Sequence, residues 1–283
     1  MDISVGIIVY NEENNIGNLL NSISRQKTKN VKINEIIVVS SGSTDRTNKI
    51  VRGFSKKNNK IKLIIQKKRK GKASAINEFL KKAKSEILVL ESGDTLPEKN
   101  AIGSLSRPLT NKKIGIVASH PVPLNNKKSF LDSAIRLQWL LHHKISLKSP
   151  KFGELIAFRK VFDKIENTAA DEEYIAMLIK NNRLLGAYAP DAMVHNTGPK
   201  TIASLIKQRR RIYWGHLELK KKYGYKAATM RNFLVFSVIL KELKIKNILP
   251  VAFGIFIEVY SRLLGLYDYY TDKKHYIWNV AKK

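Results

Sequence analysis

The first polar segment that could do chemistry comes directly after the opening apolar run Ile3–Val9. Tyr10, Asn11 and Glu12 supply an aromatic ring, an amide and a carboxylate at the end of an expected strand, ahead of an expected helix. Such side chains, beside the free N–H groups of a helix, can hold the base and ribose of a nucleotide. They could equally do no more than cap the helix.

A second polar segment follows the apolar run Glu35–Val39. Ser40 and Ser41 end that run, and a glycine-containing turn with Ser43 and Thr44 comes next. Because parallel strands place their carboxyl ends at one edge of a sheet, we expect these hydroxyls and backbone donors to lie beside the first segment. A purely structural turn, with Ser43 or Thr44 as the N-cap of the next helix, is the alternative.

The elements that would position these segments alternate along the first 120 residues. We expect strands at Ile3–Val9, Glu35–Val39, Lys62–Ile65, Ile87–Leu90 and Ile114–Ala118. We expect helices at Ile16–Ser24, Thr47–Phe54, Ala73–Ala83 and Lys99–Leu105. Strands that alternate with single helices indicate βαβ units and a mostly parallel sheet flanked by helices, which is an α/β fold.

Composition narrows the classes of protein and partner. The chain has 283 residues, 43% of them hydrophobic, and no cysteine, so disulfides, thiolate nucleophiles and zinc–sulfur sites are excluded. The N-terminus shows no secretory signal, and we expect it to stay in the cytosol. A net charge of +29 favours a polyanionic partner such as anionic lipid, a phosphorylated substrate or nucleic acid. A solvated, lysine-rich surface would account for the charge equally well.

The two polar segments and five later motifs occur in an order that resembles the family 2 glycosyltransferases of the GT-A fold. The later motifs are Gly71–Asn77, Ser92–Pro97, Gly153–Arg159, Asp171–Glu173 and Gln208–Arg211. Together they extend over about residues 3–216. The resemblance implies a GT-A-like, Rossmann-type domain that binds a nucleotide-sugar donor and transfers the sugar with inversion.

Within the donor site, the resemblance implies base and phosphate contacts. Ser40 stands where the family commonly has an aspartate that is implied to contact the base, so the preferred base stays open. Lys72 follows Gly71 at a loop-to-helix junction, where it could meet a phosphate as a point charge. The basic residues that precede Gly71 offer a simpler explanation of Lys72, as part of a charged surface.

A metal motif is implied at the next strand end. Ser92 stands where the family usually has an aspartate, and Asp94 remains as the carboxylate on the metal side. A diphosphate leaving group needs its developing charge neutralised, which a divalent cation with oxygen ligands, Mn²⁺ or Mg²⁺, provides. Asp94 follows the apolar run Ile87–Leu90, where such an ion would lie. Alternatively, Asp94 caps a helix that begins near Pro97.

Catalysis by inversion needs one general base that takes the proton of the acceptor. The resemblance implies that this base is Asp171, the first of three consecutive acids. Glu172 and Glu173 would then be charges that favour the N-terminus of a helix. In the alternative interpretation, all three acids only begin that helix.

The motif Gln208–Arg211 resembles the Gln-x-x-Arg-Trp motif of processive members. Ile212 stands where the tryptophan would follow, so we do not expect a long processive channel. Gln208 and Arg211 are predicted to contact the donor, because an arginine can clamp a diphosphate with two hydrogen bonds. His195, near the end of a strand, is a weaker candidate for a metal ligand and is more often structural.

Three parts of the chain are expected: a nucleotide-sugar-binding half (1–120), an acceptor-binding and catalytic half (121–228), and an apolar helical tail (229–283). Small and polar residues recur every three or four positions in the tail and form a narrow stripe on an apolar helix. The stripe comprises Asn247, Pro250, Gly254, Glu258, Ser261, Gly265 and Asp268. Glu258 and Arg262 can pair four residues apart, which favours an interfacial or re-entrant helix over a simple span. A buried core helix is the alternative.

The sequence therefore predicts an inverting glycosyltransferase that moves a sugar from a UDP- or GDP-sugar to an acceptor near the membrane. The basic surface and apolar tail suggest a polyprenyl- or lipid-linked acceptor, an anionic membrane surface, and a peripheral or re-entrant position on the cytoplasmic side. A basic nucleic-acid-binding protein and an inactive glycosyltransferase-like scaffold are the rival interpretations. No nucleic acid partner is expected, because no nucleic-acid-binding fold signature is present.

Overall fold

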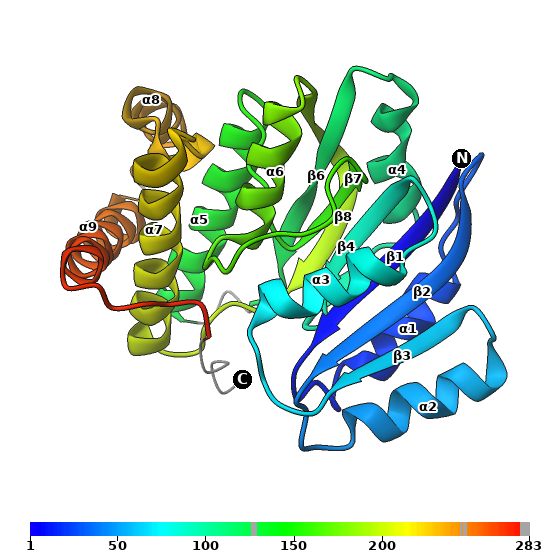
Figure 1. The fold of residues 1–283 in the computed structure, drawn as a ribbon. Coiled ribbons are helices and arrows are strands. Elements are labelled where there is room, and N and C mark those ends of the chain that lie inside the picture. The colour runs from blue at the N-terminus through cyan, green and yellow to red at the C-terminus, as the bar shows by residue number, and fades with distance from the viewer. Residues whose placement is uncertain (126–128, 244, 246–247, 278–283) are drawn as a thin grey trace.

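A computed structural model describes residues 1–125, 129–243, 245 and 248–277 of the chain. Within these ranges one sheet has the strand order β3-β2-β1-β4-β7-β6-β8-β5 (Figure 1). The strands are β1 (Asp2–Val9), β2 (Lys32–Ser41), β3 (Ile61–Gln66), β4 (Ile87–Ser92), β5 (Thr95–Pro97), β6 (Ile114–Pro123), β7 (Leu155–Arg159) and β8 (Leu185–Asn196). All five predicted strands are confirmed.

Four neighbouring strands form the parallel part of the sheet. β1 pairs in parallel with β2 and β4, and β2 pairs in parallel with β3. These strands are apolar on both faces because helices cover both sides, as buried parallel strands require. Their carboxyl ends meet at one edge, where the two polar segments lie.

The remaining strands make the sheet mixed. β7 runs antiparallel to both β4 and β6, β6 is parallel to β8, and β5 is antiparallel to β8. The expectation of a mostly parallel sheet thus describes the first half of the chain best. The domain boundary predicted at residue 120 falls inside β6, and both halves contribute strands to the same sheet.

The helices of the sheet layer bury one apolar side each. They are α1 (Ile16–Ser24), α2 (Thr47–Lys57), α3 (Lys72–Lys82), α4 (Ala101–Ser106) and α6 (Asp171–Asn181). α1, α2 and α4 contribute to the core on one face of the sheet, whereas α3 and α6 contribute to the core on the other. Val38 of β2 faces the first core, and its neighbours Ile37 and Val39 face the second. This alternation is the period of two that a strand imposes.

The structure around Pro97 contradicts the alternative interpretation of Asp94 as a helix cap. No helix begins there: Thr95–Pro97 is the strand β5, which pairs with Val194–Asn196 of β8. A short 3₁₀ turn, η1 (Arg107–Thr110), follows α4, which itself begins only at Ala101 after the N-cap Asn100. Asp94 therefore cannot cap a helix at Pro97, and that interpretation was wrong because the chain first adds an edge strand to the sheet.

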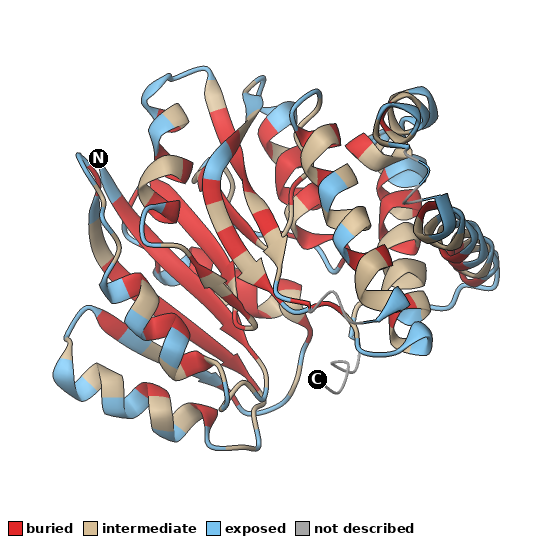
Figure 2. Cartoon of the chain, turned by 180° about the vertical axis from the view of Figure 1, so that it is seen from behind, coloured by how far each residue is buried: buried red, intermediate tan, exposed pale blue. Residues whose placement is uncertain are grey.

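A second group of helices stands beside the sheet (Figure 1). It comprises α5 (Phe130–Ser146), α7 (Ile202–Tyr223), α8 (Asn232–Glu242) and α9 (Ile248–Tyr270), with the 3₁₀ turn η2 (Ala228–Met230) before α8. α9 packs against α7 and α5. Figure 2 shows that much of the outer side of α9 is exposed, in contrast to the buried strands of the sheet.

The polar stripe of α9 faces inward. Ser261 and Asp268 are fully buried, and a side chain on Gly265 would meet the backbone oxygen of Arg210 at 2.9 Å. The predicted pair is confirmed, with Arg262 Nε 2.8 Å from Glu258 Oε1. Asn247, the first member of the predicted stripe, lies outside the described residues. The small and polar side of α9 therefore lies against the protein, together with Val251 and Ile257, whereas most of its other large apolar residues are exposed.

Candidate active site

The carboxyl edge of the parallel strands opens into a pocket of about 540 Å³. Its walls come from the ends of β1, β2 and β4, the beginnings of α3 and α6, the segment before β7, and the helices α5, α7, α8 and α9. The sheet edge and the second helix group thus form one cavity between them. Most of the sequence-predicted site residues line this cavity.

The loop after β1 is tied to the loop after β2. Asn11 has a left-handed backbone with φ of 53°, and its side-chain oxygen accepts from the backbone N–H of Thr44 at 2.8 Å. The backbone N–H of Glu12 donates to the Thr47 hydroxyl at 2.8 Å. Tyr10 and Glu12 line the pocket, whereas Asn11 does not. Asn11 therefore holds the two loops in register.

The two serines of the second loop have different surroundings. The Ser40 hydroxyl is fully buried and donates to the Ser43 hydroxyl at 2.9 Å, away from the pocket lining. Ser41 lines the pocket, and its buried hydroxyl oxygen has no hydrogen-bond partner among the described residues. Across this loop, the Arg69 guanidinium stacks 3.9 Å from the centre of the Tyr10 ring.

Lys72 begins α3 directly after Gly71, whose φ of 89° favours glycine. The Lys72 ammonium pairs with Glu172 and lies 3.4 Å from the Ser92 hydroxyl. Burial alone would lower the pKa of Lys72, but the carboxylates of Glu172 and Asp171 outweigh burial and raise it. Lys72 is therefore a fixed positive charge in the pocket wall rather than a freely solvated surface lysine.

Asp94 and Glu154 supply carboxylates on the same side of the pocket. Glu154 has a left-handed φ of 57°, and its backbone oxygen accepts from the Ser92 N–H at 3.2 Å. Burial, followed by the charge of Asp94, raises the pKa of Glu154 to about 7. Two carboxylates in one partly enclosed space fit a hard divalent cation, which prefers oxygen ligands.

The carboxylates do not complete a metal site by themselves. Among the described residues, no group of three or more histidine, aspartate or glutamate side chains is arranged to hold a metal ion. A cation at Asp94 would thus take further ligands from water and from the phosphates of a donor, as Mg²⁺ commonly does. His195 lies outside the pocket lining, where its Nε2 is 2.9 Å from Glu98 Oε1.

The three acids at the start of α6 have three different surroundings. Asp171 is 2% exposed and lines the pocket, and its Oδ1 has no hydrogen-bond partner among the described residues. Glu172 pairs with Lys72, and Glu173 accepts from the Tyr225 hydroxyl at 2.8 Å. Burial raises the pKa of Asp171 to about 7, although Lys72 acts against the rise. Glu172 and Glu173 therefore make tertiary contacts in addition to beginning the helix, and Asp171 lines the pocket.

The three arginines of α7 are likewise divided. Arg211 and Gln208 line the pocket, and the pKa of Arg211 is lowered by burial against the opposing charges of Asp171 and Glu172. In contrast, Arg209 makes two hydrogen bonds to Glu258, at 2.8 and 3.2 Å, and Arg210 pairs with Asp268. Two consecutive arginines thus join α7 to α9, and the third lies near the acids that line the pocket.

Several pocket residues were missed from the sequence. Glu154 lies within the motif Gly153–Arg159, which assigns it no role, and Lys151 and His142 lie in no motif. Tyr276 and Ile277 also line the pocket, because the segment after α9 returns to within 3.1 Å of where a Gly71 side chain would lie. A lone lysine, a lone histidine and a distant chain end carry no spacing signal, so only the fold brings them together.

Comparison with solved structures identifies the fold. A mannosyltransferase from Pyrobaculum calidifontis, solved with GDP-Man and Mn²⁺, is 19% identical, with a TM-score of 0.72 over 96% of this chain and 88% of that one. Glucosyl-3-phosphoglycerate synthase from Mycobacterium tuberculosis, solved with Mn²⁺, UDP and phosphoglyceric acid, is also 19% identical. Its TM-score is 0.55 over 76% of this chain and 77% of that one. The GT-A-like fold is therefore confirmed.

Curated relatives give the family. A probable glycosyltransferase of Bacillus subtilis is 34% identical over 140 residues, which cover 48% of this chain and 33% of the relative. The poly-beta-1,6-N-acetyl-D-glucosamine synthase of Staphylococcus epidermidis is 27% identical over 223 residues, or 74% of this chain and 53% of the relative. This chain thus spans between a third and about half of the length of these two proteins. The family model described as "Glycosyl transferase family 2" matches residues 4–163, more than half of the chain, which therefore belongs to that family.

Proposed function

We propose that this protein is an inverting glycosyltransferase that uses a UDP- or GDP-sugar, a divalent cation and Asp171 as the general base. The observation that carries this proposal is the state of Asp171. Its carboxylate is buried, faces the pocket, and has an oxygen without a hydrogen-bond partner among the described residues. Such an oxygen is free to accept a proton from a bound hydroxyl.

The protonation behaviour of Asp171 suits this role. A general base works best when its pKa lies near the working pH, because it is then largely ionised and still binds a proton well. Burial raises the pKa of Asp171 to about 7. Asp171 would take the proton of the acceptor hydroxyl as the oxygen attacks the anomeric carbon, opposite the departing diphosphate.

The donor side of the pocket supports binding of a diphosphate. Lys72 and Arg211 lie close enough to Asp171 and Glu172 to lower the pKa values of both carboxyl groups. Both cations therefore lie beside the proposed general base. They could hold phosphate oxygens by charge-assisted hydrogen bonds. A divalent cation, Mn²⁺ or Mg²⁺, held by Asp94 with Glu154 beside it, would neutralise the charge that develops on the diphosphate. The likeness to structures solved with these ions supports this choice.

The second helix group supports an acceptor near a membrane. By length and composition alone, α9 could cross a bilayer, and 22% of its most apolar 18-residue stretch is buried in the protein. One such helix is by itself weak evidence for a membrane span. Large apolar side chains of α8 and α9 face outward, including Phe233 (86% exposed), Leu249 (72%) and Phe256 (65%). The buried ion pairs on the other side favour a helix that lies on the membrane, because a spanning helix would carry them into the hydrocarbon core.

Charge supports the same placement. The chain carries a net charge of +29, which an anionic lipid surface would attract. We therefore propose a peripheral position on the cytoplasmic side, with a polyprenyl- or other lipid-linked acceptor reaching the pocket from the bilayer. The apolar outer face would supply binding that added salt does not screen.

A donor screen followed by one substitution tests this function. Purified protein is mixed with UDP- and GDP-sugars with and without Mn²⁺ or Mg²⁺, and thermal stabilisation identifies the donor. We expect Asp171→Asn to keep donor binding and lose transfer, because an amide keeps the shape of the side chain but accepts no proton. Turnover of Asp171→Asn close to that of the unchanged protein would remove Asp171 from its role. A screen in which no nucleotide-sugar binds would overturn the proposed function itself.

A further inference from the structure

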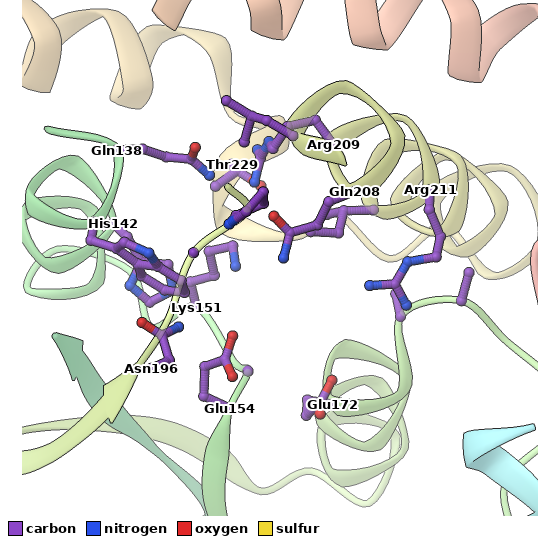
Figure 3. A pocket seen from close by; sticks show the side chains of 18 of the residues that line it. Gln138, His142, Lys151, Glu154, Glu172, Asn196, Gln208, Arg209, Arg211 and Thr229 are labelled. Atoms are coloured by element: carbon purple, nitrogen blue, oxygen red, sulfur yellow. The ribbon is translucent and has the colours of Figure 1, made fainter. Parts of the chain in front are cut away.

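The pocket has a second polar end, on the far side of Glu154 from Arg211 and Glu172. Figure 3 shows His142, Lys151 and Asn196 gathered there. His142 comes from α5, Lys151 from the segment before β7, and Asn196 from the last position of β8. The end of α5, the segment that follows it and the distant end of β8 thus direct polar side chains into one corner of the cavity, which we call the α5 corner.

Two of these side chains are buried without partners. His142 is 8% exposed, and neither of its ring nitrogens has a hydrogen-bond partner among the described residues. Asn196 is 6% exposed, and its side-chain oxygen is likewise unpartnered within the described part of the chain. Buried polar groups are rarely left unbonded, since each costs about 1–3 kcal/mol. A polar ligand in the α5 corner would satisfy both.

The charge of the α5 corner selects the kind of ligand. Burial lowers the pKa of Lys151, while the carboxylates of Glu173, Glu154 and Glu172 oppose that change. Burial lowers the pKa of His142, and the charges of Lys151 and Arg209 lower it further. The imidazole is therefore neutral in a positive field, with one N–H to donate. The ammonium and the imidazole N–H are donors and match a tetrahedral oxyanion, whereas the Asn196 side-chain oxygen only accepts and would bond to an O–H group of the same ligand.

Two of the counter-charges near the α5 corner, Glu258 and Glu173, are already engaged elsewhere. Glu258 pairs with both Arg209 and Arg262, which leaves that group one positive charge in excess. Glu173 accepts from the Phe152 N–H at 3.2 Å as well as from Tyr225, and burial raises its pKa. The α5 corner can therefore take up an anion without displacing an ion pair.

We propose that Lys151 and His142 bind the phosphate of a phosphate-bearing acceptor, separately from the donor diphosphate, and that the Asn196 side-chain oxygen accepts from an O–H group of that acceptor. This inference rests on the proposed function and narrows the acceptor class. The pocket wall continues from the α5 corner along apolar side chains between α5, α7 and α9. This apolar wall comprises Ile135, Ile145, Leu205, Val251 and Ile257. The phosphate could belong to a lipid whose chain lies along the apolar wall or to a soluble phosphate ester.

Calorimetric titration of the full chain tests the phosphate site. The metal and the nucleoside diphosphate found in the donor screen are kept saturating, so that the donor site is occupied. Two probes are used: glycerol 3-phosphate and dihexanoyl phosphatidic acid. We expect Lys151→Gln to weaken binding at least about tenfold, because it removes the charge, and Lys151→Arg to retain most of it. His142→Asn should weaken binding less.

Lys148→Gln is the matched control, because it removes the same charge from an exposed position three residues away. Nucleotide binding should be unchanged in every variant, which also shows that each one is folded. Tighter binding of the lipid probe assigns the phosphate to a lipid, and equal binding assigns it to a soluble ester. Binding that is insensitive to Lys151→Gln, or equally sensitive to Lys148→Gln, overturns the site. If nucleotide-sugars bind normally in that case, the phosphate site fails and the proposed glycosyltransferase function stands.

Discussion

Helices α3 and α9 both reach the pocket, but they differ in which residues they bury and which they expose. α3 buries Ile76, Phe79 and Leu80 against the sheet and ends in the exposed residues Lys81 and Lys82. α9 buries a stripe of small and polar residues with Val251 and Ile257, and it exposes most of its other large apolar residues. One helix is therefore arranged for water outside and an apolar core inside. The other is arranged for an apolar environment outside, which supports the membrane-proximal part of the proposed function.

The charged residues near α3 and those near α9 also have different surroundings. At the α3 end, Lys72 pairs with Glu172 and lies near Asp171, and all three side chains line the pocket. At the α9 end, arginines and acids are paired with each other and hold two helices together. Similar residues thus line the pocket in one place and join helices in the other, and substitutions should separate the proposed catalytic role from the structural one.

The largest effect is expected at the α3 end, for Asp171→Asn. We expect the transfer rate to fall by about 10²–10⁴-fold, the usual contribution of a positioned general base. Donor affinity should change little, because Lys72 and Arg211 remain. Rate measurements with the donor from the screen, alongside nucleotide binding, check both parts. An equal loss of binding and rate would indicate a role in holding the donor instead.

At the α9 end, Asp268→Ala should affect stability rather than chemistry. Asp268 is fully buried and pairs with Arg210 and with His275, so its removal leaves Arg210 without its carboxylate. Breaking such a pair costs about 3 kcal/mol or more. Chemical denaturation should show the loss, while Asp272→Ala, at an exposed acid four residues away, should show almost none. Equal stability of the two variants would mean that the pair does not fasten α9.

Asp94→Ala tests the proposed metal site on the donor side of the pocket. We expect metal-dependent nucleotide binding to weaken by about tenfold or more, since an oxygen ligand of the cation is lost. Asp163→Ala, at an exposed acid, is the control. Nucleotide affinity is measured across a titration of Mn²⁺. Identical curves for the unchanged protein and Asp94→Ala would place the cation elsewhere.

The outer face of α9 is tested by Phe256→Ser combined with Leu263→Ser, which are 65% and 60% exposed. Burial of a large apolar side chain contributes about 1.5–3 kcal/mol, so binding to vesicles of mixed phosphatidylglycerol and phosphatidylcholine should fall by about tenfold or more. Ile65→Ser, on the edge strand β3, is the control and should leave binding unchanged. These substitutions are preferable to a truncation before α8, because Gly254 and Glu258 of α9 line the pocket.

Vesicle binding of the double variant should also lose the part that resists added salt, because only the charge attraction remains. Undiminished binding in high salt would show that the outer face of α9 does not contact lipid.

The two regions also differ in how far the sequence alone predicted them. The strands and helices of the first 120 residues follow short apolar runs of clear period, and the motifs at their ends lie at one sheet edge, as expected. β5 was missed because Thr95–Pro97 is too short to show a period and is fixed only by pairing with β8. The stripe of α9 was visible in the sequence, but its partner helix was not. Lys151 and His142 lacked any motif, since their meeting depends on tertiary packing.

The last and smallest effect concerns pH, and it links the chemistry of Asp171 to the stability of the fold. With its pKa raised to about 7, Asp171 is mostly protonated below pH 7 and is a competent base only above it. The transfer rate should therefore rise by about tenfold per pH unit below that pKa and level off above it.

The stability of the fold should change with pH in the opposite direction. Because the folded pKa is higher than the unfolded one, the protonated carboxyl favours the folded state at low pH, and this contribution is lost as the pH rises from about 4 to about 7. Asp171→Asn, which cannot ionise, should abolish the rise in rate and be more stable than the unchanged protein at pH 8. Thermal unfolding from pH 5 to pH 8 gives the comparison. If both proteins lose stability in parallel over that range, the titrating group is not Asp171, and the pH dependence of transfer must be assigned to another carboxyl of the pocket.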